Sequence, residues 1–338
     1  MASEHLNVGL IGVGRIGKLH AEHLAHRLPG VRLGAIADVN VEAARACAVR
    51  LGVSKALGDY HAILNDPDIH AVAICSPTNT HARIVVEAAN AGKHIFCEKP
   101  IDLALDKVDE ALAAVKKAGV KLQLGFNRRF DANFARVRKA IASGEIGALR
   151  ILHIVSRDPA PPPIEYVKVS GGIFMDMTIH DFDMARFLAG DEVEEVYVSG
   201  GVTVDPAIGA AGDLDTALIV LRFRNGVMGT IDNCRQAVYG YDQRVEAFGS
   251  KGSIQTDNNY ANSAIIANAS SVGRDLPLNF FMERYTESFL AEMRAFAGAV
   301  LSNQPVPVTG EDARAALLMA LAARRSYEAN RPEKVGTK

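Results

Sequence analysis

Two titratable side chains, Asp176 and His180, stand four residues apart in the chain and could together transfer a proton. Residues at this spacing share one face of a helix, and the segment from about Gly172 to Ala189 has helical spacing. An imidazole exchanges protons near neutral pH, and a carboxylate one turn away can orient it and stabilise its charged form. The pair could instead bind substrate hydroxyls or form a salt-bridged polar helix face. Spacing alone slightly favours the polar helix face.

A lysine in the segment Cys97-Glu98-Lys99-Pro100 is a further candidate for chemistry, because this segment directly follows the apolar run His94–Cys97. At the end of a strand, Lys99 could donate a hydrogen bond to a substrate hydroxyl or help to remove its proton. Burial and cationic neighbours would lower its pKa towards neutrality. The alternative is a surface lysine before a loop proline.

A glycine-rich turn, Gly12-Val13-Gly14-Arg15-Ile16-Gly17, follows the apolar run Val8–Ile11 and opens a helical stretch. This pattern is weak alone, but strand, turn and helix together are the context that dinucleotide binding requires. Gly12 permits the tight turn, Gly14 lets the backbone approach a pyrophosphate, and Gly17 lets helix and strand pack closely. The helix N-terminus then offers free amides to phosphate.

An acidic residue, Asp38, lies 24 residues beyond Gly14 at the end of the second apolar run. A carboxylate there binds ribose hydroxyls and repels a 2′-phosphate, which favours NAD over NADP. The alternatives are a glycine-rich turn with an exposed aspartate, or FAD binding, for which a second nucleotide signature is missing. The turn Ser76–Thr80 could line the coenzyme cleft, cap the next helix, or do both. The other candidate coenzyme contacts are Arg15, Ile16, Ser76, Thr78, Asn79, His81, Glu98 and Lys99.

The first third of the chain alternates strand-like runs with Ala-rich helical stretches, such as Val41–Leu51 and 81–91. This alternation predicts parallel βαβ units, and hence a doubly wound Rossmann sheet. The predicted strands are 8–11, 33–37, 71–75, 94–97 and 121–125.

After about residue 125 strands follow one another, which predicts an open, mostly antiparallel sheet with helices. Asn225-Gly226 predicts a hairpin turn, and Asp158–Pro163 an extended loop. The fold class is therefore α/β plus α+β, with a dinucleotide-binding domain over 1–125 and a substrate-binding and oligomerisation domain over 126–338. The strands expected here are 149–156, 196–204, 214–223, 227–233 and 244–248, with helices over 172–189, 281–301 and 311–329, the last of which could pack back on the first domain.

The composition is that of a globular protein: 338 residues with 49% apolar and 22% charged residues. A formal net charge of −2 attracts neither nucleic acid nor an anionic membrane. No signal peptide or membrane-spanning run is visible, so we expect a cytoplasmic protein. The four cysteines form no CxxC pair and are expected to be reduced thiols, and no Cys/His cluster predicts a metal site.

The chain resembles the glucose-fructose oxidoreductase, inositol dehydrogenase and rhizopine catabolism (Gfo/Idh/MocA) family over nearly its whole length. Within the family, two tracts resemble the inositol dehydrogenase branch. The matching motifs are the glycine turn 12–17, Glu98-Lys99-Pro100, Gly171-Gly172 followed by Asp176 and His180, the tract 170–188, and 239–244 with 248–252.

The resemblance implies a role for each matching residue. Lys99 would contact nicotinamide and substrate, His180 would accept the proton, and Asp176 would complete the catalytic set. Tyr239 would lie near the substrate ring. Asn127, Arg157 and Asp158 are further substrate-binding candidates on segments expected to face the cleft.

The resemblance also implies an activity: NAD-dependent oxidation of a ring hydroxyl of a cyclic polyol, with myo-inositol converted to 2-keto-myo-inositol (scyllo-inosose). The alternatives are the same chemistry on scyllo-inositol, another inositol isomer, glucose or levoglucosan, or a non-catalytic NAD-binding sensor. No metal is expected in the reaction. Open sheets in this family pair face to face, so we expect a homotetramer.

Overall fold

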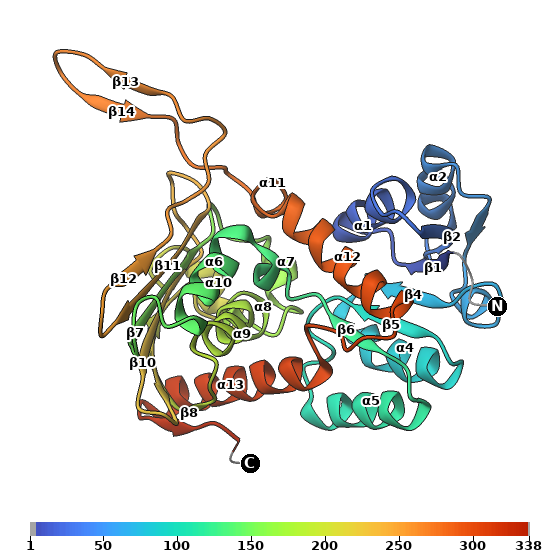
Figure 1. The fold of residues 1–338 in the computed structure, drawn as a ribbon. Helices are drawn as coiled ribbons and strands as arrows, with labels where there is room; N and C mark the ends of the chain where they lie inside the picture. Colours follow the sequence, from blue (N-terminus) through green and yellow to red (C-terminus); the bar gives the residue numbers. More distant parts are fainter. Residues whose placement is uncertain (1–4, 337–338) are drawn as a thin grey trace. The chain divides into compact units, whose positions relative to one another are not determined.

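The computed structural model describes residues 5–336 of the chain (Figure 1). It divides into two compact units. One contains the chain up to Asn127 together with Glu287–Ala315, and the other contains Arg128–Thr286 and the chain from Ala316 onwards. The last of the three boundaries between the units falls inside helix α13 (Gly310–Ala329).

The first unit is built on a six-stranded sheet in the order β3-β2-β1-β4-β5-β6, and all its strand pairs are parallel. All five strands predicted for this part of the chain are confirmed. The additional strand, β3, is only three residues long and contains no buried residue, so it lacks an apolar run that would reveal it. The strands are β1 (Leu6–Ile11), β2 (Val31–Ala37), β3 (Lys55–Leu57), β4 (Ala71–Ile74), β5 (His94–Cys97) and β6 (Leu122–Leu124).

Helices complete the first unit and bury its apolar faces. Helix α12 (Thr286–Leu301), from much later in the chain, contributes Met293 and Phe296 to the same core as Leu10 and Phe96. Burying side chains of this size stabilises the fold by about 1.5–3 kcal/mol each, which ties the late helix to the early sheet. The other helices are α1 (Arg15–His26), α2 (Val41–Leu51), α3 (His61–Leu64), α4 (Thr78–Asn90) and α5 (Leu105–Ala118).

The second unit is built on a seven-stranded sheet in the order β12-β11-β7-β10-β9-β8-β15. Its pairs are antiparallel except for β7 with β10, which confirms a mostly antiparallel sheet. The predicted turn at Asn225-Gly226 joins β9 to β10, and Gly226 adopts a φ of +87°. The strands are β7 (Leu149–Arg157), β8 (Val193–Gly201), β9 (Thr216–Phe223), β10 (Met228–Cys234), β11 (Asp242–Gly249), β12 (Ser253–Gln255) and β15 (Glu333–Lys334).

One face of this sheet is covered by helices, among them α6 (Ala132–Ala142) and α9 (Thr178–Ala189) (Figure 1). Alternate residues of β9 are therefore buried and exposed. A two-stranded arm, β13 (Ile265–Ala267) with β14 (Val272–Arg274), projects from the same unit (Figure 1). The remaining short elements are η1 (Asn127–Phe130), α7 (Ile164–Val167), α8 (Ile173–Asp176), α10 (Pro206–Ala210) and α11 (Phe281–Arg284).

The single helix predicted over 172–189 is wrong: α8 ends at Asp176 and α9 begins at Thr178. The intervening Met177 has φ −96° and ψ −61°, and the His180 amide bonds the Met177 carbonyl at 3.3 Å, an i to i−3 contact. The Thr178 hydroxyl donates to Asn233 Oδ1 at 2.6 Å, so a tertiary contact acts on the chain at the break. The predicted helix 281–301 is likewise two elements, α11 and α12.

Among residues 5–336, no helix combines the length and the apolar character that a membrane crossing would need.

The glycine turn brings backbone segments so close that side chains are excluded. A Cβ on Gly17 would lie 2.1 Å from the carbonyl oxygen of Gly12, and a Cβ on Gly12 would lie 2.6 Å from backbone atoms of Cys75 and Ser76. Gly14 differs, because a Cβ there would meet nothing within 4 Å and its φ of −62° suits any residue.

Replacing Gly17 with Ala should therefore destabilise the protein by at least about 2 kcal/mol, the usual scale of overpacking against an unyielding neighbour. Gly14→Ala is the matched control and should unfold near the wild-type temperature. Thermal unfolding without added coenzyme measures both. Equal melting temperatures for the two variants would contradict the packing role of Gly17.

Candidate functional site

The carboxyl edge of the first sheet gathers the predicted coenzyme residues of the glycine turn and of β2. Asp38 accepts the Val13 amide on Oδ2 and the Asn40 amide on Oδ1, each at 2.8 Å. The structure thus brings the glycine turn and the acidic residue together. With both oxygens held by amides, the carboxylate is fixed in place, where it can receive ribose hydroxyls.

Helix α1 begins within the glycine turn, and Gly14 caps it without a side-chain hydrogen bond. Arg15 and Ile16 form its first turn, which contains no acidic residue. The first amides of a helix lack intrahelical acceptors and carry the positive end of its dipole. This terminus is suited to a phosphate group.

The turn after β4 forms its own hydrogen bonds. Ser76 and Thr80 share a hydroxyl hydrogen bond of 2.7 Å, and α4 begins at Thr78 without a side-chain cap. His81 is 2% exposed, with Nδ1 2.8 Å from the Pro100 carbonyl oxygen and Nε2 2.7 Å from that of Ser76. Its ring therefore links this turn to the Glu-Lys-Pro segment. A direct coenzyme contact of Thr78, Asn79 or His81 remains a prediction.

The Glu-Lys-Pro segment follows β5 at the same sheet edge. The Glu98 amide donates to the Ile74 carbonyl at 3.0 Å, and Glu98 Oε1 lies 2.8 Å from His20 Nε2 on α1. Lys99 is half-buried and precedes a cis peptide bond to Pro100. Asn127, at the end of this unit, is 3% exposed.

Asp176 and His180 belong to the second unit, at the end of α8 and in the first turn of α9. The Tyr166 hydroxyl donates to Asp176 Oδ1 at 2.8 Å, and Arg235 Nη1 donates to Oδ2 at 3.2 Å. Arg235 is 1% exposed, so its charge acts on Asp176 with little solvent screening. Burial, with the nearby Asp176 charge, raises the pKa of Tyr166, which keeps it a hydrogen-bond donor.

Asp213 supports this arrangement from the other side. Its Oδ1 accepts the Ile173 amide at 2.9 Å at the start of α8, and its Oδ2 lies 3.6 Å from Arg235 Nη2. The sequence reasoning missed Tyr166, Asp213 and Arg235. They lie 10, 37 and 59 residues from Asp176, so no local spacing links them to it.

Arg157 and Tyr239, two predicted substrate-binding residues, contact each other. Arg157 Nη1 donates to the Tyr239 hydroxyl at 3.1 Å, and its guanidinium also forms an ion pair with Asp232. Tyr239 in turn donates to Asp242 Oδ2 at 2.6 Å. Although burial opposes ionisation, hydrogen bonds from Arg244, Tyr239 and neighbouring groups lower the pKa of Asp242 to about 2. The two residues are therefore held by a charged network.

Asp158 lies beyond the end of β7, where its amide donates to the Cys234 carbonyl at 2.9 Å. Burial raises the pKa of Asp158 to about 6; the nearby Arg235 charge opposes this rise and the Asp176 charge adds to it. Asp158 thus changes charge close to neutral pH, and its carboxyl belongs to the same electrostatic environment as Asp176.

Two family models match the chain. The "Oxidoreductase family, NAD-binding Rossmann fold" model covers residues 6–126, and the "GFO/IDH/MocA C-terminal domain" model covers residues 134–255.

Individual proteins match over almost the whole chain. A myo-inositol 2-dehydrogenase of Thermotoga maritima is 50% identical over 98% of both chains. The structure of a protein described as a putative myo-inositol dehydrogenase from Sinorhizobium meliloti 1021 has 45% identity and a TM-score of 0.94, covering 98% of this chain and 100% of that one. The structure of scyllo-inositol dehydrogenase from Lactobacillus casei with NAD(H) and scyllo-inositol has 31% identity and a TM-score of 0.92, covering 98% and 100%.

The pKa of Asp158 predicts how stability varies with pH. Because its pKa is about 6 in the folded protein and 3.8 ordinarily, the unfolded chain loses this proton first as pH rises. The tighter binding of this proton by the folded protein stabilises it fully below pH 4, and this contribution to the free energy of unfolding is lost between about pH 4 and 6. Asp158→Asn, which stays neutral, should therefore be more stable than wild type at pH 7.5, on the order of 2–3 kcal/mol, and little different at pH 4.

Denaturant unfolding at the two pH values measures this difference. Asp205→Asn, at the exposed N-cap of α10, is a control that should not reproduce the gain at pH 7.5, because Asp205 accepts the Ala207 amide at 2.9 Å. An Asp158→Asn variant less stable than wild type at pH 7.5 would show that the folded protein stabilises the charged carboxylate, and would contradict a raised pKa.

Proposed function

Because the chain belongs to the Gfo/Idh/MocA family of NAD-binding oxidoreductases, we propose that it oxidises a ring hydroxyl of myo-inositol to yield 2-keto-myo-inositol (scyllo-inosose). The protein is an oxidoreductase, and its cofactor is NAD. The observation that carries the substrate assignment is 50% identity, over 98% of both chains, to a myo-inositol 2-dehydrogenase.

We assign the chemistry to Lys99, Asp176 and His180. The reaction takes a proton from the hydroxyl oxygen and a hydride from the carbon that bears it, leaving a ketone. When bound, NAD supplies the acceptor for the hydride. His180 accepts the proton, and Lys99 donates a hydrogen bond to the oxygen and stabilises the negative charge that develops there. Asp176, itself held by Tyr166 and Arg235, favours the charged form of the imidazole.

The first unit is assigned to the coenzyme and the second to the substrate and to oligomerisation. Asp38 binds the adenosine ribose and selects NAD over NADP. The remaining proposed coenzyme contacts are Gly12, Gly14, Arg15, Ile16, Ser76, Thr78, Asn79, His81 and Glu98. The proposed substrate contacts beside the catalytic set are Asn127, Arg157, Asp158 and Tyr239.

A second candidate substrate is scyllo-inositol, because the Lactobacillus casei relative holds it together with NAD(H). The two isomers differ in the orientation of one hydroxyl, which a pocket distinguishes by the placement of hydrogen-bonding groups. Other inositol isomers, glucose and levoglucosan belong in the same assay, and a non-catalytic NAD-binding sensor would reduce no coenzyme with any of them.

His180→Ala should lower kcat by about 10²–10⁴-fold, the usual contribution of a general base, and should leave the dissociation constant for NAD within about threefold of wild type. NADH formation with a panel of cyclitols and sugars measures the rate, and coenzyme fluorescence titration measures binding. His26, an exposed residue in the last turn of α1, offers a matched control. His26→Ala should retain wild-type turnover, whereas equal loss of turnover and NAD binding in His180→Ala would contradict the assignment.

We also propose a cytoplasmic homotetramer. Four large apolar side chains of the second sheet are exposed on the face away from its helices: Leu218, Val220, Met228 and Phe248. The β13–β14 arm exposes Ile265, Ile266 and Val272 as well, and an isolated two-stranded hairpin is marginally stable in water. A second copy of the chain would cover both surfaces.

Leu218→Glu should dissociate this assembly, because a charge would be buried in an apolar interface. Val49→Glu, in helix α2 of the first unit, is the control, since Val49 is 83% exposed. Light scattering coupled to size-exclusion chromatography should give a tetramer for wild type and for Val49→Glu, and a smaller species for Leu218→Glu. A monomeric wild-type protein would refute the proposal.

A further inference from the structure

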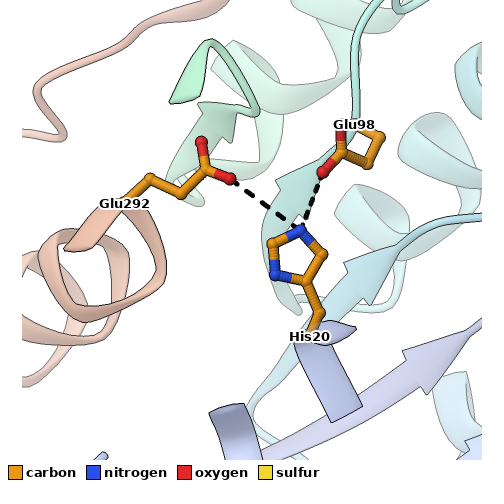
Figure 2. Close-up of side chains that lie close together, drawn as sticks. All are labelled: His20, Glu98 and Glu292. Carbon is orange, nitrogen blue, oxygen red and sulfur yellow. Dashed lines mark hydrogen bonds and ion pairs between the residues drawn. The ribbon is translucent and has the colours of Figure 1, made fainter. Parts of the chain in front are cut away.

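Three acid–base side chains from distant parts of the chain meet inside the first unit (Figure 2). His20 comes from α1, Glu98 follows β5 and Glu292 comes from α12. His20 Nε2 lies 2.8 Å from Glu98 Oε1 and 3.8 Å from Glu292 Oε1. Both carboxylates point at the same ring nitrogen (Figure 2).

The cluster is removed from water on nearly all sides. The side chains of His20 and Glu292 are 0% exposed, and that of Glu98 is 13% exposed. The rings of Phe96 and Phe289 pack edge-on against His20, with centroids 5.1 and 5.8 Å away. Charge in such surroundings is strongly destabilised unless it is paired or coordinated.

The buried side chain of Glu292 lacks the hydrogen-bond partners that usually accompany a buried carboxylate. Neither of its carboxylate oxygens has a hydrogen-bond partner, although its backbone carbonyl accepts Gln123 Nε2 at 2.7 Å and so holds the helix in place. The buried Glu292 carboxyl points at an imidazole and at a second carboxylate, and it receives no hydrogen bond. A cation at the centre of the three groups would supply the missing partner.

We propose that His20 Nε2, a Glu98 oxygen and a Glu292 oxygen bind one divalent transition-metal ion. The three ligand atoms all lie within 4.8 Å of one another. Separations of 2.8, 3.8 and at most 4.8 Å place them on a circle with a radius of at most about 2.4 Å. Zn–N and Zn–O bonds are about 2.0–2.2 Å long, so an ion near the centre of that circle would need only small ligand shifts.

The donor set selects the class of ion. An imidazole favours Zn²⁺, Fe²⁺ and similar ions over Mg²⁺ and Ca²⁺, whereas the two carboxylates also suit Mn²⁺. A divalent charge would neutralise two buried carboxylates, which a monovalent ion or a single proton would not. Water would reach the ion only on the side of Glu98, the partly exposed ligand.

The ion would be structural. It would join α1, the end of β5 and α12, and it would fix the side chain of Glu98, the residue before Lys99. The sequence concealed the site because its ligands are 78 and 194 residues apart, far from any metal-binding spacing. The proposal does not depend on the substrate, because all three ligands lie in the first unit.

A proton on Glu292 is the competing state. Burial raises the pKa of Glu292 well above its ordinary value, and the Glu98 charge raises it further. Without a metal the carboxyl would therefore be neutral. Direct measurement of bound metal separates the two states.

The test begins with the full-length protein, stripped with a chelator and dialysed at pH 7.5 against Zn²⁺ or Mn²⁺ in separate experiments. Bound metal is measured by elemental mass spectrometry, and thermal unfolding is followed with and without the ion. We expect one ion per chain and a higher melting temperature with metal. In Glu292→Gln we expect binding at least tenfold weaker and no metal-dependent gain in melting temperature.

His61→Ala is the matched control for adventitious surface binding. His61 Nδ1 lies 2.6 Å from Asp59 and His61 Nε2 lies 3.4 Å from Glu87, but the His61 and Asp59 side chains are 53% and 69% exposed. This variant should bind like wild type. Metal content lost in His61→Ala but kept in Glu292→Gln would overturn the proposal, as would a wild-type protein that retains neither ion. If Glu292→Gln fails to fold, His20→Gln replaces it, with the same expected loss.

Discussion

The close approach of α1 to the sheet at Gly12 and Gly17 is the constraint on which the first unit depends. No side chain fits between the Gly17 Cα and the Gly12 carbonyl, so the helix can start only where two glycines allow it. That start places the α1 N-terminus beside Asp38, and it places His20, about one and a half turns further on, beside Glu98. The coenzyme-binding edge and the buried His–Glu cluster therefore share one packing requirement.

In the second unit, the predicted site depends on charged side chains that are largely shielded from water. Its predicted catalytic carboxylate is embedded in partners: Tyr166 and Arg235 bond Asp176, while Asp213 bonds the start of α8 and approaches Arg235. In a medium that screens charge poorly, such contacts are strong and fix the position of the carboxylate. The raised pKa of Asp158 is the other consequence, because the cost of removing this carboxylate from water exceeds the stabilisation that the Arg235 and Arg128 charges provide.

The second unit also exposes apolar surface that its own helices do not cover. Helices cover one face of its sheet, whereas the opposite face and the β13–β14 arm expose large apolar side chains. Exposed apolar patches of this kind are typical of interaction sites. The same sheet thus carries helices on one side and exposes the proposed assembly surface on the other.

The sequence alone determined the elements whose signal is local. The alternation of apolar runs with helical stretches revealed the Rossmann sheet, and Asn225-Gly226 revealed a hairpin. The glycine spacing predicted a turn that lies beside Asp38, as the Val13–Asp38 hydrogen bond shows. It could not reveal β3, which buries no residue, or the break at Met177, where the Thr178 hydroxyl bonds Asn233 from a distant strand. Nor could it reveal the partners of Asp176, or that Glu292 joins His20 and Glu98. Those contacts link residues far apart in the chain, and only the packing of α12 and of the second sheet brings them within bonding distance.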